Sequence, residues 1–70
     1  MKELIYKSYK MGYDACPDKS SAPGQNKDFI QILPYCTVDD DETIMLRMTM
    51  YKAYINGWSQ AHLDKMWNVD

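Results

Sequence analysis

Apolar residues recur every three or four positions over residues 2–15, the spacing of an amphipathic helix. One face of this predicted helix carries Ile5, Tyr9, Gly12 and Cys16, flanked by Tyr6 and Tyr13. The opposite strip is polar and consists of Lys7, Lys10 and Asp14. Proline disfavours the helical conformation of the residue before it, so Pro17 is expected to end the helix.

The same spacing predicts a second long helix over residues 40–67. Its polar arc comprises Thr49, Lys52, Asn56, Ser59 and Gln60. One apolar flank is mostly small: Leu46, Met50, Ala53, Gly57 and Ala61. The other is bulky: Ile44, Met48, Tyr51, Ile55, Trp58, His62 and Met66. One short helix cannot cover so wide an apolar arc, so we expect a second contact, with segment 28–36, a second copy in a homodimer, or another macromolecule.

An acidic run marks the start of this second helix. Capping patterns place an acid three residues after the N-cap, and two pairs fit: Thr37 with Asp40, or Asp39 with Glu42. The acids also suit the positive end of the helix dipole. The alternative interpretation of Asp39, Asp40, Asp41 and Glu42 is a docking patch for a basic protein partner.

Between the helices, residues 17–27 are rich in Pro, Gly, Ser and Asn and are predicted to form a loop or linker. Asp28 can cap a short helical turn over about residues 28–33, which Pro34 ends. The predicted fold is therefore all-α: one small domain, residues 1–70, with two long helices (2–15 and 40–67) joined by a loop and a short helical turn.

Two glycines interrupt the predicted helices, although each costs about 1 kcal/mol of helix stability relative to alanine. Gly57 lies between Ala53 and Ala61 in a stripe that lets another helix approach closely, and Gly12 is its counterpart in the first helix. Each glycine is followed by an aromatic residue, Tyr13 or Trp58, that can close over the contact. We therefore expect Gly12, Tyr13, Gly57, Trp58 and Ala61 to form the helix packing.

The composition restricts the classes of function. The chain has 70 residues and a net charge of −2, unlike a strongly basic nucleic-acid-binding protein. No apolar run approaches the roughly 20 residues that cross a bilayer, so no membrane contact is expected. The N-terminus is too polar for a signal-peptide core, which predicts a cytoplasmic location.

Residues suited to catalysis or metal binding are scarce, so neither an enzyme nor a cofactor is expected. Cys16 and Cys36 lie twenty residues apart without a zinc-site spacing, and two half-buried thiols are favoured over a disulfide. His62 and Asp64 point in different directions on a helix, so they cannot form a dyad. His62 is expected to be a packed side chain, although a Cys–His nucleophile pair is a weaker alternative.

Tyrosines alternate with lysines in both predicted helices. Such residues can stack on unpaired bases and contact phosphates. The favoured interpretation of these residues by themselves is that the tyrosines are amphipathic core residues and the lysines are solvated. The candidates in question are Tyr6, Lys7, Tyr9, Lys10 and Tyr13 in the first helix and Tyr51, Lys52 and Tyr54 in the second.

Three stretches, "KMGYDA", "LPY" and "YINGWSQA", resemble in order the landmarks of the ribosome modulation factor family. That family carries a GYxA motif, a Pro-Tyr pair in the connecting segment, and a helix with aromatic-x-x-Gly-Trp-x-x-Ala. The matching positions here are Gly12, Tyr13, Ala15, Pro34, Tyr35, Tyr54, Gly57, Trp58 and Ala61. The resemblance implies a two-helix protein with a structured connector.

The resemblance also implies a stationary-phase factor that binds 16S ribosomal RNA near the anti-Shine–Dalgarno end, blocks initiation and promotes inactive ribosome dimers. The family is strongly basic, whereas this chain has "MKELIYKSYK" in place of an arginine-rich N-terminus, Ser59 and Gln60 in place of basic residues, and an added "DDDE".

The leading hypothesis is a non-enzymatic regulator that binds the ribosome and its RNA and lowers translation. The expected phosphate contacts are Lys7, Lys10, Arg47, Lys52 and Lys65, and the expected stacking residues are Tyr6, Tyr9, Tyr35 and Tyr54. The alternative is a small protein–protein inhibitor or adaptor that acts on a host protein, with a phage as one conceivable source of the chain. It would use Asp39–Glu42 and the Met/Trp flank.

Overall fold

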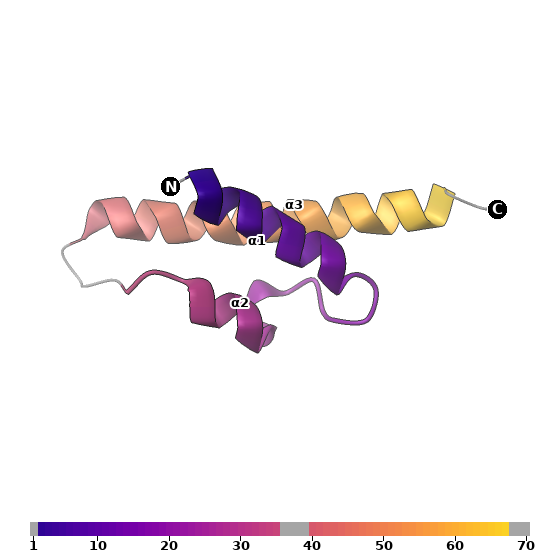
Figure 1. The fold of residues 1–70 in the computed structure, drawn as a ribbon, viewed down its shortest axis with the longest axis horizontal. Helices are drawn as coiled ribbons and strands as arrows, with labels where there is room; N and C mark the ends of the chain where they lie inside the picture. The colour runs from indigo at the N-terminus through magenta and orange to yellow at the C-terminus, as the bar shows by residue number, and fades with distance from the viewer. Residues whose placement is uncertain (1, 36–39, 68–70) are drawn as a thin grey trace.

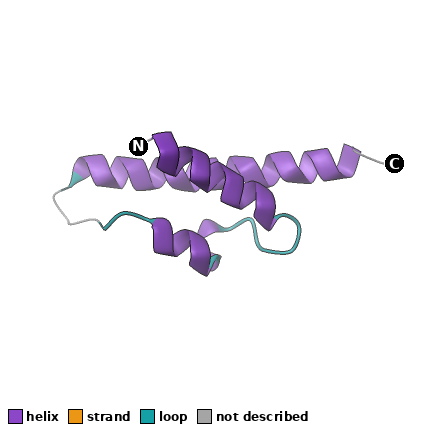
Figure 2. Ribbon diagram, in the orientation of Figure 1, coloured by secondary structure: helices purple, strands orange, loops and turns teal. Residues whose placement is uncertain are grey.

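The computed structural model describes residues 2–35 and 40–67, and these form helices joined by loops (Figures 1 and 2). Helix α1 spans Lys2–Ala15, a 3₁₀ turn η1 spans Pro23–Gln25, α2 spans Lys27–Ile32 and α3 spans Asp41–Trp67. The described residues contain no strand, so the predicted all-α fold class is confirmed. Segment 17–27 is more ordered than predicted, because η1 and the start of α2 fall within it.

The long helix α3 forms the axis of an elongated molecule of 50 × 20 × 14 Å. Helix α1 lies diagonally across it and runs in the same direction, and the connector returns the chain past α2 along the side of α3 (Figure 1). None of the described helices is long and apolar enough to cross a membrane.

The backbones of α1 and α3 touch where the two glycines lie. A Cβ atom built on Gly12 would lie 2.0 Å from the carbonyl oxygen of Tyr54, and one built on Gly57 would lie 2.0 Å from that of Tyr9. Both distances are far below van der Waals contact, and both neighbours are backbone atoms that cannot rotate away. Only glycine fits at these positions, as the sequence predicted.

The buried face of α1 differs from the predicted one. Its centre is Ser8, Gly12 and Ala15, whereas Tyr9 is 36% exposed. Where the helices are this close, only small side chains fit between them, so the Tyr9 ring lies to one side. The buried Ser8 hydroxyl is satisfied because it donates to the carbonyl oxygen of Leu4 at 2.7 Å.

The core lies where α2 meets the two long helices. Phe29 of α2 and Met50 and Tyr54 of α3 are fully buried and pack with Ala15. The Phe29 ring lies 4.9 Å from the Tyr54 ring and 5.6 Å from the Tyr51 ring, both in tilted contacts. Aromatic pairs in such geometry add to the free energy of burial. Segment 27–32 therefore covers part of the bulky flank of α3, one of the contacts that the sequence left open.

The cap of α2 is Asn26, not Asp28 as predicted. The side-chain oxygen of Asn26 accepts hydrogen bonds from the amides of Asp28 at 3.0 Å and Phe29 at 3.3 Å. Asp28 lies in the first turn, where its charge favours the helix dipole. The Asn26 side chain is buried, and its amide nitrogen donates to the Tyr54 hydroxyl at 2.9 Å. This second hydrogen bond holds the side chain in the capping position.

At the start of α3, Asp40 supplies the capping hydrogen bonds. Its carboxylate accepts from the Thr43 amide at 3.0 Å and the Thr43 hydroxyl at 2.5 Å. This pairing differs from both predicted caps, whose Thr37 and Asp39 lie outside the described residues. The acidic run thus begins a helix, which was the favoured interpretation, with Asp41 and Glu42 in the first turn.

The Asp40 cap predicts an acid-sensitive helix start. Hydrogen bonds from the Thr43 hydroxyl and then its amide hold the pKa of Asp40 below its usual 3.8. A carboxyl whose pKa is lowered by folding stabilises the fold above its unfolded pKa, and this stability is lost as the pH falls through the folded pKa. Urea unfolding at intervals from about pH 6 to pH 2 should show this loss beginning near pH 4.

The matched variant is Asp40→Asn, which keeps a capping acceptor but does not titrate. Its free energy of unfolding should fall less between these pH values than that of the wild type. Superimposable pH profiles would exclude Asp40 as an acid-sensitive cap.

Candidate nucleic-acid interface

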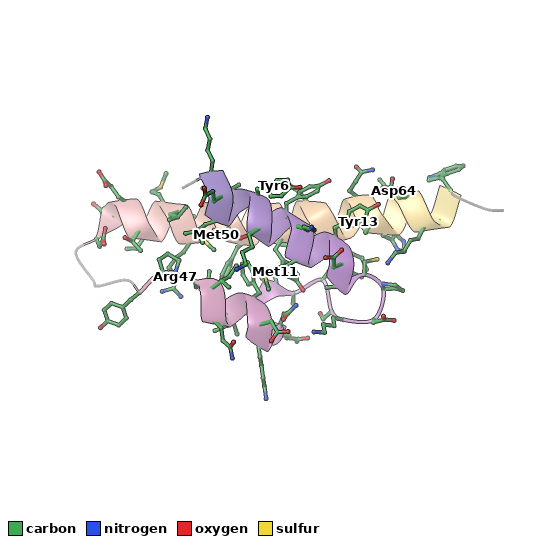
Figure 3. The ribbon with its side chains drawn as sticks, in the orientation of Figure 1. Tyr6, Met11, Tyr13, Arg47, Met50 and Asp64 are labelled. Carbon is green, nitrogen blue, oxygen red and sulfur yellow. The ribbon has the colours of Figure 1, made fainter. Side chains whose placement is uncertain are left out.

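Lys2, Tyr6, Tyr9 and Lys10 follow one another along α1 at helical spacing and share the side that faces away from the core. We call these four residues the α1 outer face. The Tyr6 ring is 69% exposed and Tyr9 is 36% exposed, whereas both lysines are exposed. Figure 3 shows the Tyr6 ring at the edge of α1, away from α2. Two aromatic rings between two cations suit unpaired nucleotides, because rings stack on bases and ammonium groups contact phosphates.

The charge around the α1 outer face is only weakly positive. Lys7 is exposed beside it, and within the described residues no hydrogen bond or ion pair holds Lys7 or Lys10. Glu3 and Asp14 lie one turn away from these lysines and offset part of their charge. The attraction of this face for an anion is therefore modest, and the two exposed tyrosine rings are its larger feature.

Tyr13, which follows Tyr6 and Tyr9 along the helix, has an intramolecular partner. Its hydroxyl donates a 2.6 Å hydrogen bond to Asp64 of α3, and Gln60 donates to the same carboxylate at 2.8 Å (Figure 3). The bond from Tyr13 and that from Gln60 lower the pKa of Asp64, and the bond to Asp64 raises the pKa of Tyr13. Tyr13 therefore links α1 to α3, in keeping with its expected role in helix packing.

Tyr54 was expected to stack on bases, and this prediction is wrong. Its side chain is fully buried, its ring packs on Phe29, and its hydroxyl accepts a hydrogen bond from Asn26. Helix α1, which crosses near Gly12, and helix α2 together cover the Tyr54 side chain, so none of it is accessible to a base. Tyr35 of the connector, in contrast, is 88% exposed.

The structure does not bring the five expected phosphate contacts together. Arg47 is half-buried and lies on the α2 side of α3, opposite the edge where Tyr6 lies (Figure 3). Lys65 donates a hydrogen bond to the carbonyl oxygen of Cys16, just beyond the end of α1, so it serves the scaffold. Lys52 is exposed on the polar arc of α3. Lys7 and Lys10 therefore remain as the pair nearest the exposed tyrosines.

The remaining chemically active side chains have structural roles. The His62 ring stacks on Trp58 at 5.5 Å, while the Trp58 indole donates to the carbonyl oxygen of Lys19 at 2.9 Å and ties the connector to α3. Cys16 is a free thiol and is buried rather than half-buried, whereas Cys36 lies outside the described residues. In the part of the chain that the structure describes, no three His, Cys, Asp or Glu residues could hold a metal ion.

Comparison of the chain with protein-family models, with curated proteins and with solved structures found no match. The resemblance to the ribosome modulation factor family therefore rests on the landmark residues alone. In the structure four of these landmarks belong to the scaffold: Gly12 and Gly57 form the helix crossing, Ala61 is buried, and Tyr54 lies in the core, whereas Tyr35 is exposed.

Proposed function

We propose that this protein is a non-enzymatic regulator that binds RNA of the ribosome through the α1 outer face and lowers translation. The observation that carries the proposal is the pair of exposed rings, Tyr6 and Tyr9, between Lys2 and Lys10 on one side of α1. The resemblance to the ribosome modulation factor family supplies the target, and the glycine-mediated crossing of α1 and α3 supports that resemblance.

Stacking supplies most of the binding energy in this proposal. A base stacked on an aromatic side chain contributes about 1–3 kcal/mol, so two rings together contribute about 2–6 kcal/mol to the binding of unpaired nucleotides. Phosphate contacts dominate the affinity of strongly basic proteins, but this chain has a net charge of −2. The proposed binding therefore depends more on stacking with unpaired bases than on attraction of the lysines to phosphates.

The acidic start of α3 limits where a strand can lie. Asp41 and Glu42 line a surface depression together with Ile5 of α1. These carboxylates repel phosphates from that side of α1. Tyr9 follows Ile5 by one helical turn and so borders this depression, which leaves Tyr6 and Lys10, farther from the carboxylates, as the path of the RNA strand.

Co-sedimentation with ribosomes over a series of salt concentrations tests the proposal. Wild-type protein should pellet with ribosomes, and binding should weaken as salt rises. Tyr6→Ala, which removes an exposed ring, should weaken binding by roughly 5- to 150-fold, as expected for one lost stacking contact of about 1–3 kcal/mol. The variant Lys7→Ser/Lys10→Ser should lower the slope of log K against log salt by about 1.4, as expected for two contacts to a single strand.

The matched control is Lys19→Ser/Lys27→Ser, which removes two exposed lysines of the connector and α2. Its only ion pair among the described residues is the solvent-exposed one between Lys19 and Asp28 at 3.7 Å. This control should bind like the wild type. Equal losses in both double variants, or no ribosome association at all, would contradict the proposal.

A protein partner is the second candidate function. The specific observation in its favour is the exposure of large apolar residues on α3, with Met48 at 52% and Trp67 at 78%. The acidic residues support it less, because Asp40 caps α3 and Asp41 and Glu42 lie in its first turn. A bound protein that is recovered by pull-down and lost when Asp39–Glu42 are changed to Ser, without ribosome association, would favour this candidate.

A further inference from the structure

The surface depression beside Ile5 is a groove between the first halves of α1 and α3. The two backbones touch at Gly12 and Gly57, and α1 lies diagonally across α3, so the helices diverge away from the crossing (Figure 1). Ile5 lies two helical turns before Gly12, about 10 Å along the helix. Here the helices leave a groove of about 340 Å³, which we call the α1–α3 groove. It is lined by Ile5 of α1 and by Asp41, Glu42, Met45, Leu46 and Thr49 of α3.

Most of the groove surface is apolar. Ile5 and Leu46 are half-buried, and Leu46 also packs against the core. Met45 is 64% exposed, and its unbranched side chain can adjust to the shape of a neighbour. The Thr49 hydroxyl donates to the Met45 carbonyl oxygen at 2.9 Å, so it is satisfied within α3. The groove therefore offers van der Waals contact to an apolar side chain.

The charge of the groove is negative at one end. Asp41 and Glu42 are exposed at the start of α3, and no ion pair among the described residues holds either carboxylate. On the α1 side, the charges of Lys2 and Glu3 offset each other. Lys52 of α3 lies beyond the other end of the groove. Two available carboxylates thus lie directly beside the apolar surface.

We propose that the α1–α3 groove binds a short amphipathic helix of another protein, one that carries bulky apolar side chains next to lysine or arginine. The apolar side chains fill the groove between Ile5 and Leu46, and the basic ones pair with Asp41 and Glu42. Nucleic acids, anionic lipid surfaces and acidic peptides are repelled by the same two carboxylates. The inference gives the second candidate function a site and a class of partner, so it rests on that candidate and is independent of RNA binding.

The backbone around the groove favours a helical occupant over an extended one. The amides and carbonyl groups of α1 and α3 are bonded within the helices, so an extended peptide finds no sheet edge with which to pair. A helix satisfies its own backbone and presents only side chains, three or four residues apart. From Asp41 to Thr49, α3 rises about 12 Å, or two helical turns. An occupant of two to three turns therefore matches the groove.

Peptide binding followed by solution NMR tests the proposal on the full chain. The probe is a synthetic helix of about 14 residues with leucines on one face and lysines on the other. It should bind with a dissociation constant on the order of 100 µM and shift the amide resonances of Ile5, Met45 and Leu46. A matched peptide with glutamate in place of every lysine should bind at least about tenfold more weakly.

Met45→Lys tests the apolar part of the groove. The variant removes an apolar contact and repels the lysines of the probe, so binding should weaken at least about tenfold. The matched control is Met66→Lys, which changes a methionine that is 52% exposed near the other end of α3. It should bind the probe like the wild type. Both methionines are exposed, so both variants should keep the wild-type helix content by circular dichroism.

Asp41→Asn/Glu42→Gln tests the charge and keeps the shape of both side chains. Binding of the leucine–lysine peptide should weaken about 3- to 30-fold, as expected for two solvent-exposed charge pairs, and should depend less on salt. The matched control is Asp14→Asn/Asp18→Asn, which neutralises two exposed carboxylates at and beyond the end of α1. It should bind like the wild type.

Absence of binding by the leucine–lysine peptide would overturn the proposal, as would equal binding of the two peptides or normal binding by Met45→Lys. Resonance shifts confined to residues outside the groove, such as Trp67, would also overturn it. The second candidate function would survive these results if a protein partner is recovered through another surface. Met45→Lys should co-sediment with ribosomes like the wild type, because Met45 is not part of the α1 outer face.

Discussion

Gly57→Ala and Gly12→Ala are each expected to destabilise the fold by about 3 kcal/mol, although alanine is the better helix former. Helix propensity alone predicts a gain of about 1 kcal/mol for either change. The added methyl group would lie 2.0 Å from a backbone carbonyl oxygen of the opposite helix. Since neither backbone can rotate away, α1 must move off α3 and lose the packing along the crossing, and this loss outweighs the gain.

Thermal unfolding measures the effect, and Gly24→Ala is the matched control. Gly24 is exposed in η1, with no atom within 4 Å of an added Cβ. Its replacement should leave the stability near that of the wild type, whereas a loss of about 3 kcal/mol should lower Tm by more than 10 °C in a domain of this size. A rise in Tm for Gly57→Ala would show that the helices do not touch at this residue.

Asn26→Ala is expected to cost about 2–4 kcal/mol, the second largest effect of a single substitution. The change removes the cap of α2, which contributes about 1 kcal/mol. It also leaves the buried Tyr54 hydroxyl without the amide that donates to it. An unsatisfied buried polar group costs about a further 1–3 kcal/mol. Urea unfolding followed by circular dichroism gives the difference in the free energy of unfolding.

Asp28→Ala separates the two interpretations of the α2 cap. If Asn26 is the cap, Asp28→Ala should have a small effect, since it removes only an exposed ion pair with Lys19 and a favourable charge in the first turn. A double-mutant cycle with Tyr54→Phe should give a coupling energy between Asn26 and Tyr54. If Asp28→Ala lowered the free energy of unfolding more than Asn26→Ala does, Asp28 would be the cap of α2 and the assignment of Asn26 would be wrong.

The helices and their crossing could be predicted from the sequence because each has a local cause. Apolar spacing identifies α1 and α3, and Pro17 ends α1. Gly57 between Ala53 and Ala61 is unfavourable for an isolated helix, so its presence indicates close packing. The structure places the two glycines at that contact.

Details that depend on tertiary contacts could not be predicted in the same way. Ser8 is polar and was not assigned to the core, and nothing in the sequence indicates that its hydroxyl bonds Leu4 within the helix. Tyr54, like the exposed tyrosines, lies near a lysine in a helical stretch, so the sequence does not distinguish it from them. Only its position beneath α2 and beside the crossing makes it a core residue. Asn26 did carry a signal, because asparagine is a strong N-cap residue and directly precedes α2.

The candidate site was predicted only in part for the same reason. Tyr6, Tyr9 and Lys10 are close in sequence and exposed, so α1 alone carries them, with Lys7 on its neighbouring polar strip. Arg47 and Lys65 come from α3, and the way in which α2 and the end of α1 pack determines that they point elsewhere. The directions of these two side chains therefore could not be predicted from the sequence of α3 alone.

The most direct test of the central claim is a measurement of proton–proton distances across the crossing by solution NMR. Nuclear Overhauser effects should connect the α-protons of Gly12 with the backbone of Tyr54, and those of Gly57 with the backbones of Tyr9 and Tyr13. If the chemical shifts show both helices but these contacts are absent, α1 does not lie against α3 at the glycines, and the scaffold that presents the α1 outer face is wrong.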